Sequence, residues 1–370
     1  MASKIVKNHT PLFHIAKRDE LPFYKSLLIR IGSIVAALIV CAIVIIAFTG
    51  ENPLSIYATI VEGAVGTKRR TWGLFQNVAM LLCVSLAVTP AFKMKFWNIG
   101  AEGQVLMGGL ATIYVMMFYG ETLQPAVLYP VMVIASILAG AIWGLIPAVF
   151  KALWNTNETL FTLMMNYIAI QLISYYTYVN AVPKGSGQIG IINSDTKAGW
   201  FPSLGGYDYL LNIIIVAALT VFMFVYLKYS KHGYELSVVG ESENTARYIG
   251  INVKKVIIRT MLLSGAMCGI AGLLLVAGTD HSITRETAGG RGFTAIMVSW
   301  LAKFNPIYMI LTSLLLVFLE KGAIQISTKF QLNPSFSEIL TGIIIFFIIG
   351  SEFFINYRIM FRHSAKKEVK

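Results

Sequence analysis

The sequence KHGYELSVVGESENTARYIGINVKK, residues 231–255, separates two long apolar runs at 209–229 and 257–279. Its charged side chains do not belong in hydrocarbon, because a charged group at mid-bilayer costs roughly 2.5–3.5 kcal/mol on insertion scales. Each flanking run is long enough to cross a membrane as a helix. The segment is therefore predicted to be a compact loop between two membrane spans.

A short amphipathic helix is predicted inside this loop. Ser242 can cap its first turn, and Glu243 stands where the helix dipole favours an acid. Gly250 suits the left-handed conformation that follows a helix end, so about eight residues would form a rod about 12 Å long. The rod has an apolar side with Ala246, Ile249 and Val253 and a polar side with Glu243, Asn244 and Arg247. Such a rod between two spans is typical of an element that docks into a groove on a soluble partner.

The composition of the whole chain indicates a membrane protein. Of its 370 residues, 56% are hydrophobic and only 13% are charged, whereas soluble domains carry roughly 25% charged residues. The net charge of +12 fits the preference of Lys and Arg for cytoplasmic loops, and no arginine-aromatic stripe indicates nucleic-acid binding. The three cysteines lie inside apolar runs without C-x-x-C spacing, so neither disulfides nor metal ligands are predicted.

About ten membrane spans are predicted, which makes the expected fold class an all-α polytopic membrane protein. The spans are 31–48, 71–90, 96–118, 126–148, 158–180, 209–229, 257–278, 291–303 with part of the preceding loop, 307–328 and 335–356. This layout predicts a basic N-terminal segment (1–30), a transmembrane domain (31–356) and a basic tail (357–370). With an even number of spans, most of the 30 basic residues fall on the side of the loop 231–255. Both ends and this loop are therefore predicted to be cytoplasmic.

Proline and glycine positions refine this layout. Pro53 suits the first turn of a helix in the amphipathic stretch 50–70, and Pro90 is expected to end the second span. Gly140 and Gly144 stand at the spacing that lets another membrane helix approach closely. The fourth span is therefore expected to pack tightly against a neighbour.

Polar residues open the third span in the octet WNIGAEGQ, residues 97–104. Asn98, Glu102 and Gln104 should face protein or a water-filled cavity, and the two glycines between them would let the backbone break or pack tightly. Two roles stay open for these polar residues. They line a substrate pathway, or they hold a helix break together by hydrogen bonds, and one residue can do both.

A second polar motif, NETLFTLMMNYIA, opens the fifth span at residues 157–169. Glu158 and Thr162 are four residues apart and share a helix face, and Asn166 and Tyr167 follow near it. Such a stripe lines a cavity or binds another helix. Its amides, hydroxyls and aromatic ring would suit a neutral ligand with ring faces and hydroxyl groups, such as a nucleoside.

Four motifs resemble permease subunits of ABC importers for branched-chain amino acids, simple sugars and nucleosides, and the resemblance runs over residues 52–356. WNIGAEGQ resembles the N-I-G-x-E-G-Q signature of the nucleoside and sugar group, and NETLFTLMMNYIA resembles its N-E-x-x-x-T-L-M-x-N-Y. GFTAIMVSWLAKFNP (292–306) resembles a further motif of that group, and GESENTARYIGI (240–251) resembles the cytoplasmic coupling loop, although Asn244 and Thr245 depart from the commoner residues. The substrate pathway is expected at Asn98, Glu102, Gln104, Glu158, Thr162, Asn166, Tyr167 and Phe293. The coupling role is expected at Gly240, Glu241, Asn244, Ala246, Arg247 and Gly250.

The resemblance implies a permease subunit that takes up nucleosides across a bacterial cell membrane. It also implies three kinds of partner: a second permease subunit, expected to be a different chain, a cytoplasmic ABC ATPase and an extracytoplasmic substrate-binding lipoprotein. The sequence has no G-x-x-x-x-G-K-[ST] motif, so ATP is expected to be hydrolysed by the partner. Neither enzymatic activity nor a bound cofactor is predicted for this chain.

Two alternative functions remain. The same machine would import a pentose or another simple sugar, which competition by free ribose would reveal. An ion-coupled secondary transporter would instead need intramembrane carboxylates, for which the candidates are Glu102, Glu158, Glu320, Glu338 and Glu352. Uptake that persists without ATP but collapses with the proton gradient would select that alternative.

Overall fold

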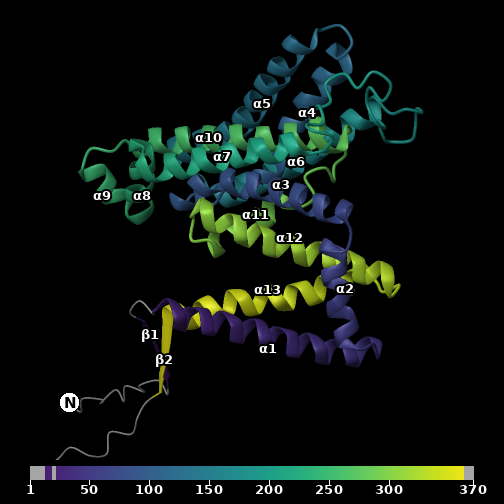
Figure 1. Cartoon of the computed structure of the whole chain (residues 1–370). Helices are drawn as coiled ribbons and strands as arrows, with labels where there is room; N and C mark the ends of the chain where they lie inside the picture. Colours follow the sequence, from purple (N-terminus) through teal and green to yellow (C-terminus); the bar gives the residue numbers. More distant parts are fainter. Residues whose placement is uncertain (1–12, 19–21, 362–370) are drawn as a thin grey trace, which may run out of the picture. The chain divides into compact units, whose positions relative to one another are not determined.

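The computed structural model describes residues 13–18 and 22–361, so the rest of the predicted segments 1–30 and 357–370 lies outside the described residues. The described chain divides into two compact units (Figure 1). Unit 1 contains the residues up to Gly66 and those from Leu319 onward, and unit 2 contains Thr67–Phe318. Nearly all elements are helices, which confirms the predicted fold class.

The elements of unit 2 are α3 (Lys68–Lys93), α4 (Ala101–Tyr119), α5 (Pro125–Trp154), α6 (Glu158–Val179), α7 (Leu210–Tyr229), α8 (Lys231–Glu241), α9 (Glu243–Tyr248), α10 (Val253–Leu275), the π-helical turn η1 (Val276–Asp280), α11 (Arg291–Leu301) and the first part of α12 (Pro306–Lys329). Unit 1 has β1 (Phe13–Lys17), α1 (Phe23–Thr49), α2 (Pro53–Val65), the end of α12, α13 (Pro334–Asn356) and β2 (Tyr357–Phe361).

Two short strands, which the sequence patterns did not predict, lie in unit 1. β1 and β2 pair antiparallel, with Phe13 opposite Phe361. This pairing places residues of the predicted segments 1–30 and 357–370 side by side. It agrees with an even number of spans, which would bring both segments to the same membrane face.

The helices of unit 1 pack closely but leave much apolar surface exposed. α1 runs along α13, and Figure 1 shows the two side by side. A Cβ added to Gly322 of α12 would lie 2.5 Å from the side chain of Ile60, so α2 packs tightly on α12. Ile39 and Ile43 of α1 are exposed, and such surface suits a lipid environment.

Eight helices in the described part of the chain are long and apolar enough to cross a membrane. α6, over the predicted span 158–180, has 22 residues but is less apolar and is not among the eight. α11 has 11 residues, so its length of about 17 Å falls short of a hydrocarbon core about 30 Å thick. The count of ten spans and the cytoplasmic position of both ends stay predictions.

α10 lies at the centre of unit 2 and packs against α3, α4 and α5. A Cβ added to Gly140 of α5 would lie 2.8 Å from the Cα of Gly269, and one added to Gly144 would lie 2.9 Å from the Met261 carbonyl oxygen. Both distances are too short for a real side-chain carbon. The predicted close approach at Gly140 and Gly144 is confirmed, and the neighbour is α10.

Two proline predictions had different outcomes. Pro53 begins α2, and the side chain of Asn52 accepts a hydrogen bond from the Leu54 amide at 2.9 Å. Pro90, in contrast, lies inside α3, so the prediction that it ends the second span is wrong. A proline interrupts only one helix bond of the preceding turn, and its own carbonyl still accepts from the Met94 amide at 3.2 Å.

Candidate functional site

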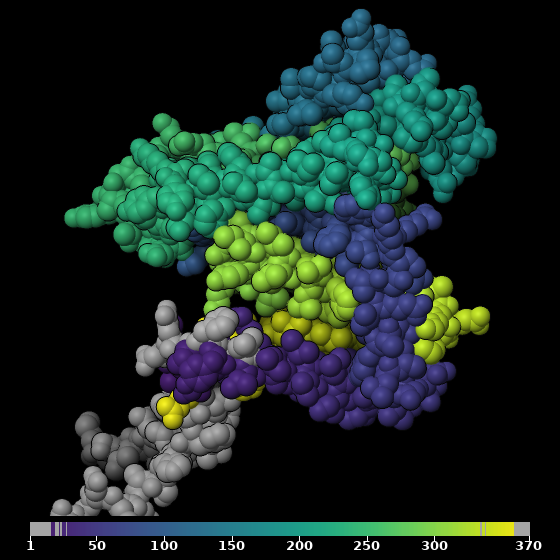
Figure 2. Space-filling model, viewed as in Figure 1, coloured from purple at the N-terminus to yellow at the C-terminus, as the bar shows by residue number. Residues whose placement is uncertain are grey.

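Helices α8 and α9 lie together at one end of unit 2, beyond the ends of α7 and α10 (Figures 1 and 2). Ser242 separates them with an extended backbone, and its side chain accepts a hydrogen bond from the Thr245 amide at 3.2 Å. Gly250 follows with φ +86°, so the predicted cap and stop of the short helix are confirmed. The helix α8 was not predicted. It begins after Ser230, whose hydroxyl accepts from the Gly233 amide at 2.9 Å.

The pair of helices, called the α8–α9 element (Lys231–Tyr248), is anchored through small residues. Ala246 is fully buried, and a Cβ added to Gly240 would collide with the carbonyl oxygen of Lys93 at the end of α3. Val253 is buried as predicted, but Ile249 is about half exposed, so its predicted place on the apolar side is wrong. Ile249 is the C-cap of α9 and already leaves the helical path.

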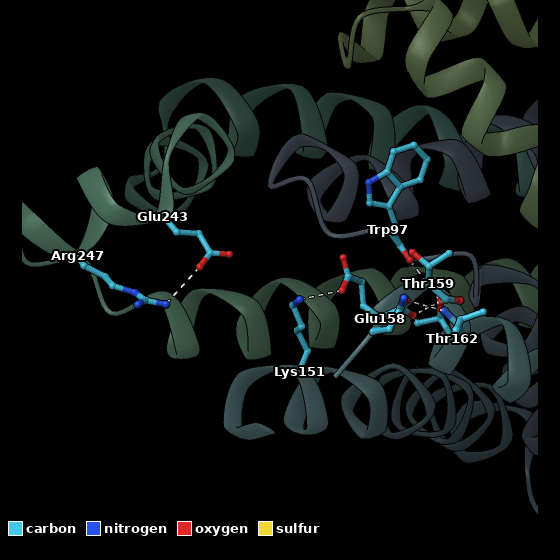
Figure 3. A network of polar contacts seen from close by, with 9 residues as sticks. Trp97, Lys151, Glu158, Thr159, Thr162, Glu243 and Arg247 are labelled. Atoms are coloured by element: carbon cyan, nitrogen blue, oxygen red, sulfur yellow. Dashed lines mark hydrogen bonds and ion pairs between the residues drawn. The ribbon is translucent and has the colours of Figure 1, made fainter. Parts of the chain in front are cut away.

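The outer surface of the α8–α9 element is accessible and carries charged and polar side chains beside the exposed ring of Tyr248. Glu241, Asn244, Arg247 and Gly250 are all exposed. Figure 3 shows Arg247 directed at Glu243, one helical turn away, with 3.2 Å between Arg247 Nη2 and Glu243 Oε2. An exposed pair of this kind stabilises a helix by only about 0.3–0.5 kcal/mol. These side chains can therefore be redirected toward a partner at little cost.

His232 joins the α8–α9 element to the membrane helices. Its Nδ1 contacts the Tyr226 hydroxyl on α7, and its Nε2 lies 3.3 Å from Thr260 Oγ1 on α10. Burial, with a contribution from the charge of Arg259, lowers the pKa of His232. The ring is therefore neutral near pH 7 and ties three helices together without a charge.

The predicted polar residue Asn98 lies in the break between α3 and α4, where it bonds to three groups. Its Oδ1 accepts from the Gly100 amide at 3.1 Å and from Gln104 Nε2 at 3.2 Å. Its Nδ2 donates to Ser264 Oγ on α10 at 3.2 Å. Asn98 and Gln104 are both buried, so they fix the break against the central helix.

Two residues of the second motif bind the same break from α6. Asn166 Nδ2 donates to the Ile99 carbonyl at 2.8 Å, and Asn166 Oδ1 accepts from the Gly103 amide at 2.8 Å. Thr162 Oγ1 accepts from the Ile99 amide at 3.2 Å and donates to the Glu158 carbonyl at 2.7 Å. One amide and one hydroxyl thus satisfy backbone groups that the start of α4 would leave unpaired.

Glu102 connects the start of α4 to the start of α11. Its Oε1 accepts from the Gly290 amide and its Oε2 from the Gly292 amide, each at 2.7 Å. A Cβ added to Gly292 would lie 2.5 Å from the Glu102 nitrogen, so only glycine fits there. A carboxylate at this place also faces the positive end of the α11 dipole.

The side chains of the other predicted pathway residues lie apart from this cluster, although the Glu158 carbonyl accepts from Thr162. Glu158 pairs with Lys151 across the turn between α5 and α6, at 2.9 Å between Nζ and Oε2 (Figure 3). Tyr167 is exposed on α6, and Phe293 is exposed on α11. The structure therefore brings together five of the eight residues, namely Asn98, Glu102, Gln104, Thr162 and Asn166. All five are hydrogen-bonded within the protein, as the helix-break alternative requires, and their role in a substrate pathway stays a prediction.

An exposed aromatic cluster near this junction was missed by the sequence patterns. The rings of Trp97 and Trp300 stack with 5.9 Å between their centroids, and about half of each side chain is exposed. Phe293 and Met297 share the exposed face of α11 with Trp300. Their spacing of four and then three residues is that of one helix face, which was the available signal in the sequence.

Comparisons with known proteins place the chain among transport permeases. The family described as branched-chain amino acid transport system / permease component matches residues 70–349. A glucose ABC transporter permease protein of Haloferax volcanii is 28% identical, with 88% of each chain covered. A guanosine ABC transporter permease protein of Bacillus subtilis is 29% identical (88% of this chain, 93% of that protein). A nucleoside ABC transporter permease protein of Lactococcus lactis is 27% identical (88% and 91%).

Proposed function

Because this chain belongs to the family of branched-chain amino acid transport system permease components, we propose that it is the membrane-spanning subunit of an ABC importer for nucleosides. It is a multi-pass membrane protein that works with an ABC ATPase, which would hydrolyse the ATP. The further partners in the proposal are a second, different permease subunit and an extracytoplasmic substrate-binding lipoprotein. The proposed location is a bacterial cell membrane.

The observation that carries the coupling proposal is the α8–α9 element. Gly240 is packed against the end of α3 and Ala246 is buried, while Glu241, Asn244 and Arg247 are exposed. A rigid, anchored element with a polar outer surface is able to transmit a push from a cytoplasmic ATPase to α3, α7 and α10. His232 supports this role, because it contacts α7 and α10 directly.

Reversing the charge of Glu241 tests this coupling. Glu241→Lys is expected to lower ATP-dependent nucleoside uptake about tenfold or more, because it reverses a charge on the surface proposed to contact the ATPase, and an unfavourable charge contact across an interface costs several kcal/mol. Chain abundance and the melting temperature should stay unchanged, since Glu241 is exposed. Uptake is measured with radiolabelled nucleoside in cells and in proteoliposomes loaded with ATP.

Glu121→Lys is the matched control, because Glu121 is an exposed carboxylate in the turn between α4 and α5. Normal ATP-dependent uptake by Glu241→Lys would contradict the coupling role. Uptake by the unaltered protein that continues without ATP and collapses with the proton gradient would favour the ion-coupled alternative instead.

The nucleoside cargo is supported by the stacked pair of Trp97 and Trp300, with Phe293 exposed on the same face of α11 as Trp300. Stacking of one base on an aromatic side chain contributes about 1–3 kcal/mol, and an exposed indole offers such a surface. Two of the three relatives described above are named for guanosine or nucleosides. The sugar alternative rests on the relative named for glucose.

Shortening Trp300 tests the cargo. Trp300→Ala is expected to raise the KM for nucleoside uptake about tenfold, because a stacking surface worth about 1–3 kcal/mol is lost. Trp154→Ala, which removes another exposed tryptophan at the end of α5, should leave the KM unchanged. An unchanged KM in Trp300→Ala contradicts the stacking role, and competition by free ribose equal to that by the nucleoside favours the sugar.

A further inference from the structure

A cavity of about 320 Å³ opens beside the start of α10. α8 contributes Lys231 and Glu235, the turn after α9 contributes the backbone at Gly250, and α10 contributes Lys255 and Arg259. Lys255 and Arg259 are four residues apart and so share one face of α10. Cations from two separate helices thus converge on a single cavity.

The charges around this cavity favour an anion. Three basic side chains line the cavity, whereas one carboxylate, that of Glu235, lines it. The distance between Glu235 Oε2 and Arg259 Nη1 is 3.9 Å, which is at the outer limit of an ion pair. The negative charge of Glu235 therefore offsets only part of the positive charge of the three basic side chains. The cavity also lies at the first turns of α10, which Asn252 caps, and the helix dipole adds positive potential there.

The position of the cavity indicates where its anion comes from. α7 and α10 are both long and apolar enough to span the membrane, and the cavity lies just past the end of α7 at Tyr229 and beside the start of α10. Tyr229 and Tyr234 are exposed, and Lys228 Nζ lies 5.3 Å from the ring centroid of Tyr229. Exposed tyrosines and lysines at the ends of spans mark the level of lipid headgroups.

We propose that this cavity binds the phosphate group of an anionic phospholipid, held by Lys231, Lys255 and Arg259. Basic pockets at the ends of membrane helices suit such headgroups. A bound lipid would hold the α8–α9 element at a fixed depth relative to the bilayer. The inference is independent of the cargo, and its test requires neither nucleoside nor ATP.

Binding of phosphatidylglycerol to the full-length chain, purified with its copurifying subunits, is measured by lipid titration and native mass spectrometry. Lys255→Gln and Arg259→Gln are each expected to weaken binding about fivefold, which corresponds to the usual contribution of one basic residue near a membrane surface. Lys254→Gln is the matched control, because Lys254 is the exposed neighbour of Lys255 and does not line the cavity. It should bind as the unaltered protein does.

Three outcomes overturn the proposal. Equal losses in Lys254→Gln and Lys255→Gln would mean diffuse attraction by surface charge. Phosphatidylcholine that binds as tightly as phosphatidylglycerol would exclude selection for an anion. Full displacement of phosphatidylglycerol by inorganic phosphate or glycerol 1-phosphate would identify a soluble phosphate as the ligand. Melting temperatures of all variants are recorded, so that a loss of binding is compared only among folded proteins.

Discussion

Replacing Gly269 by valine is expected to prevent stable folding of unit 2. A Cβ on Gly269 would collide with the carbonyl oxygen of Ser136 and lie 3.3 Å from the Cα of Ile137, both on α5. A Cβ on Gly108 of α4 would lie 2.5 Å from the Cα of Gly269. Three helices therefore meet at this residue, and the clash is with backbone, which cannot rotate away. Overpacking usually costs about 1–3 kcal/mol, and we expect at least the upper value here.

The matched control is Gly73→Val in α3, where an added Cβ would meet no atom within 4 Å. Both variants place the same β-branched residue in a helix, so they share the propensity cost. Gly269→Val should show little monodisperse protein by size-exclusion chromatography and a lower melting temperature, while Gly73→Val stays close to the unaltered protein. Equal stability of the two variants would refute the close-packing interpretation.

Removing the carboxylate of Glu102 is expected to have the second largest effect. Glu102→Ala would leave the amides of Gly290 and Gly292 without the acceptors that now lie at 2.7 Å. The Gly292 amide is buried and the Gly290 amide partly buried, and a buried amide left unpaired costs about 1–3 kcal/mol. The start of α11 should then separate from α4, with a lower melting temperature and loss of uptake. Glu102→Gln keeps one acceptor oxygen and should be intermediate.

The control for Glu102 is Glu286→Ala, because Glu286 lies in the same connection but is exposed. It should keep both stability and uptake. The pair of measurements also separates the two roles that the octet 97–104 left open. An unchanged melting temperature with a raised KM in Glu102→Ala would contradict the helix-break role and favour direct contact with the substrate.

Features that depend only on neighbouring residues could be predicted from the sequence. The cap at Ser242 was predictable because its side chain bonds to an amide three positions away, the stop at Gly250 because glycine adopts positive φ, and the start of α2 at Pro53 because the φ of proline suits a first helical turn. The apolar runs predicted most helices, because the length and hydrophobicity of a run are also properties of the local sequence. Ile249 was misplaced because helical periodicity was extended one residue past the end of α9.

Which polar residues meet depends on how the helices pack. Asn166 bonds to the Ile99 carbonyl in the break and to the Gly103 amide in α4, more than sixty residues earlier in the chain, and Glu102 accepts from amides nearly two hundred residues later. Such bonds depend on how α4, α6, α10 and α11 pack, and no local pattern specifies that packing. The sequence fixes which groups are too polar for lipid, because that cost belongs to each residue. Their partners depend on which helices lie next to each other, and that is a property of the folded chain.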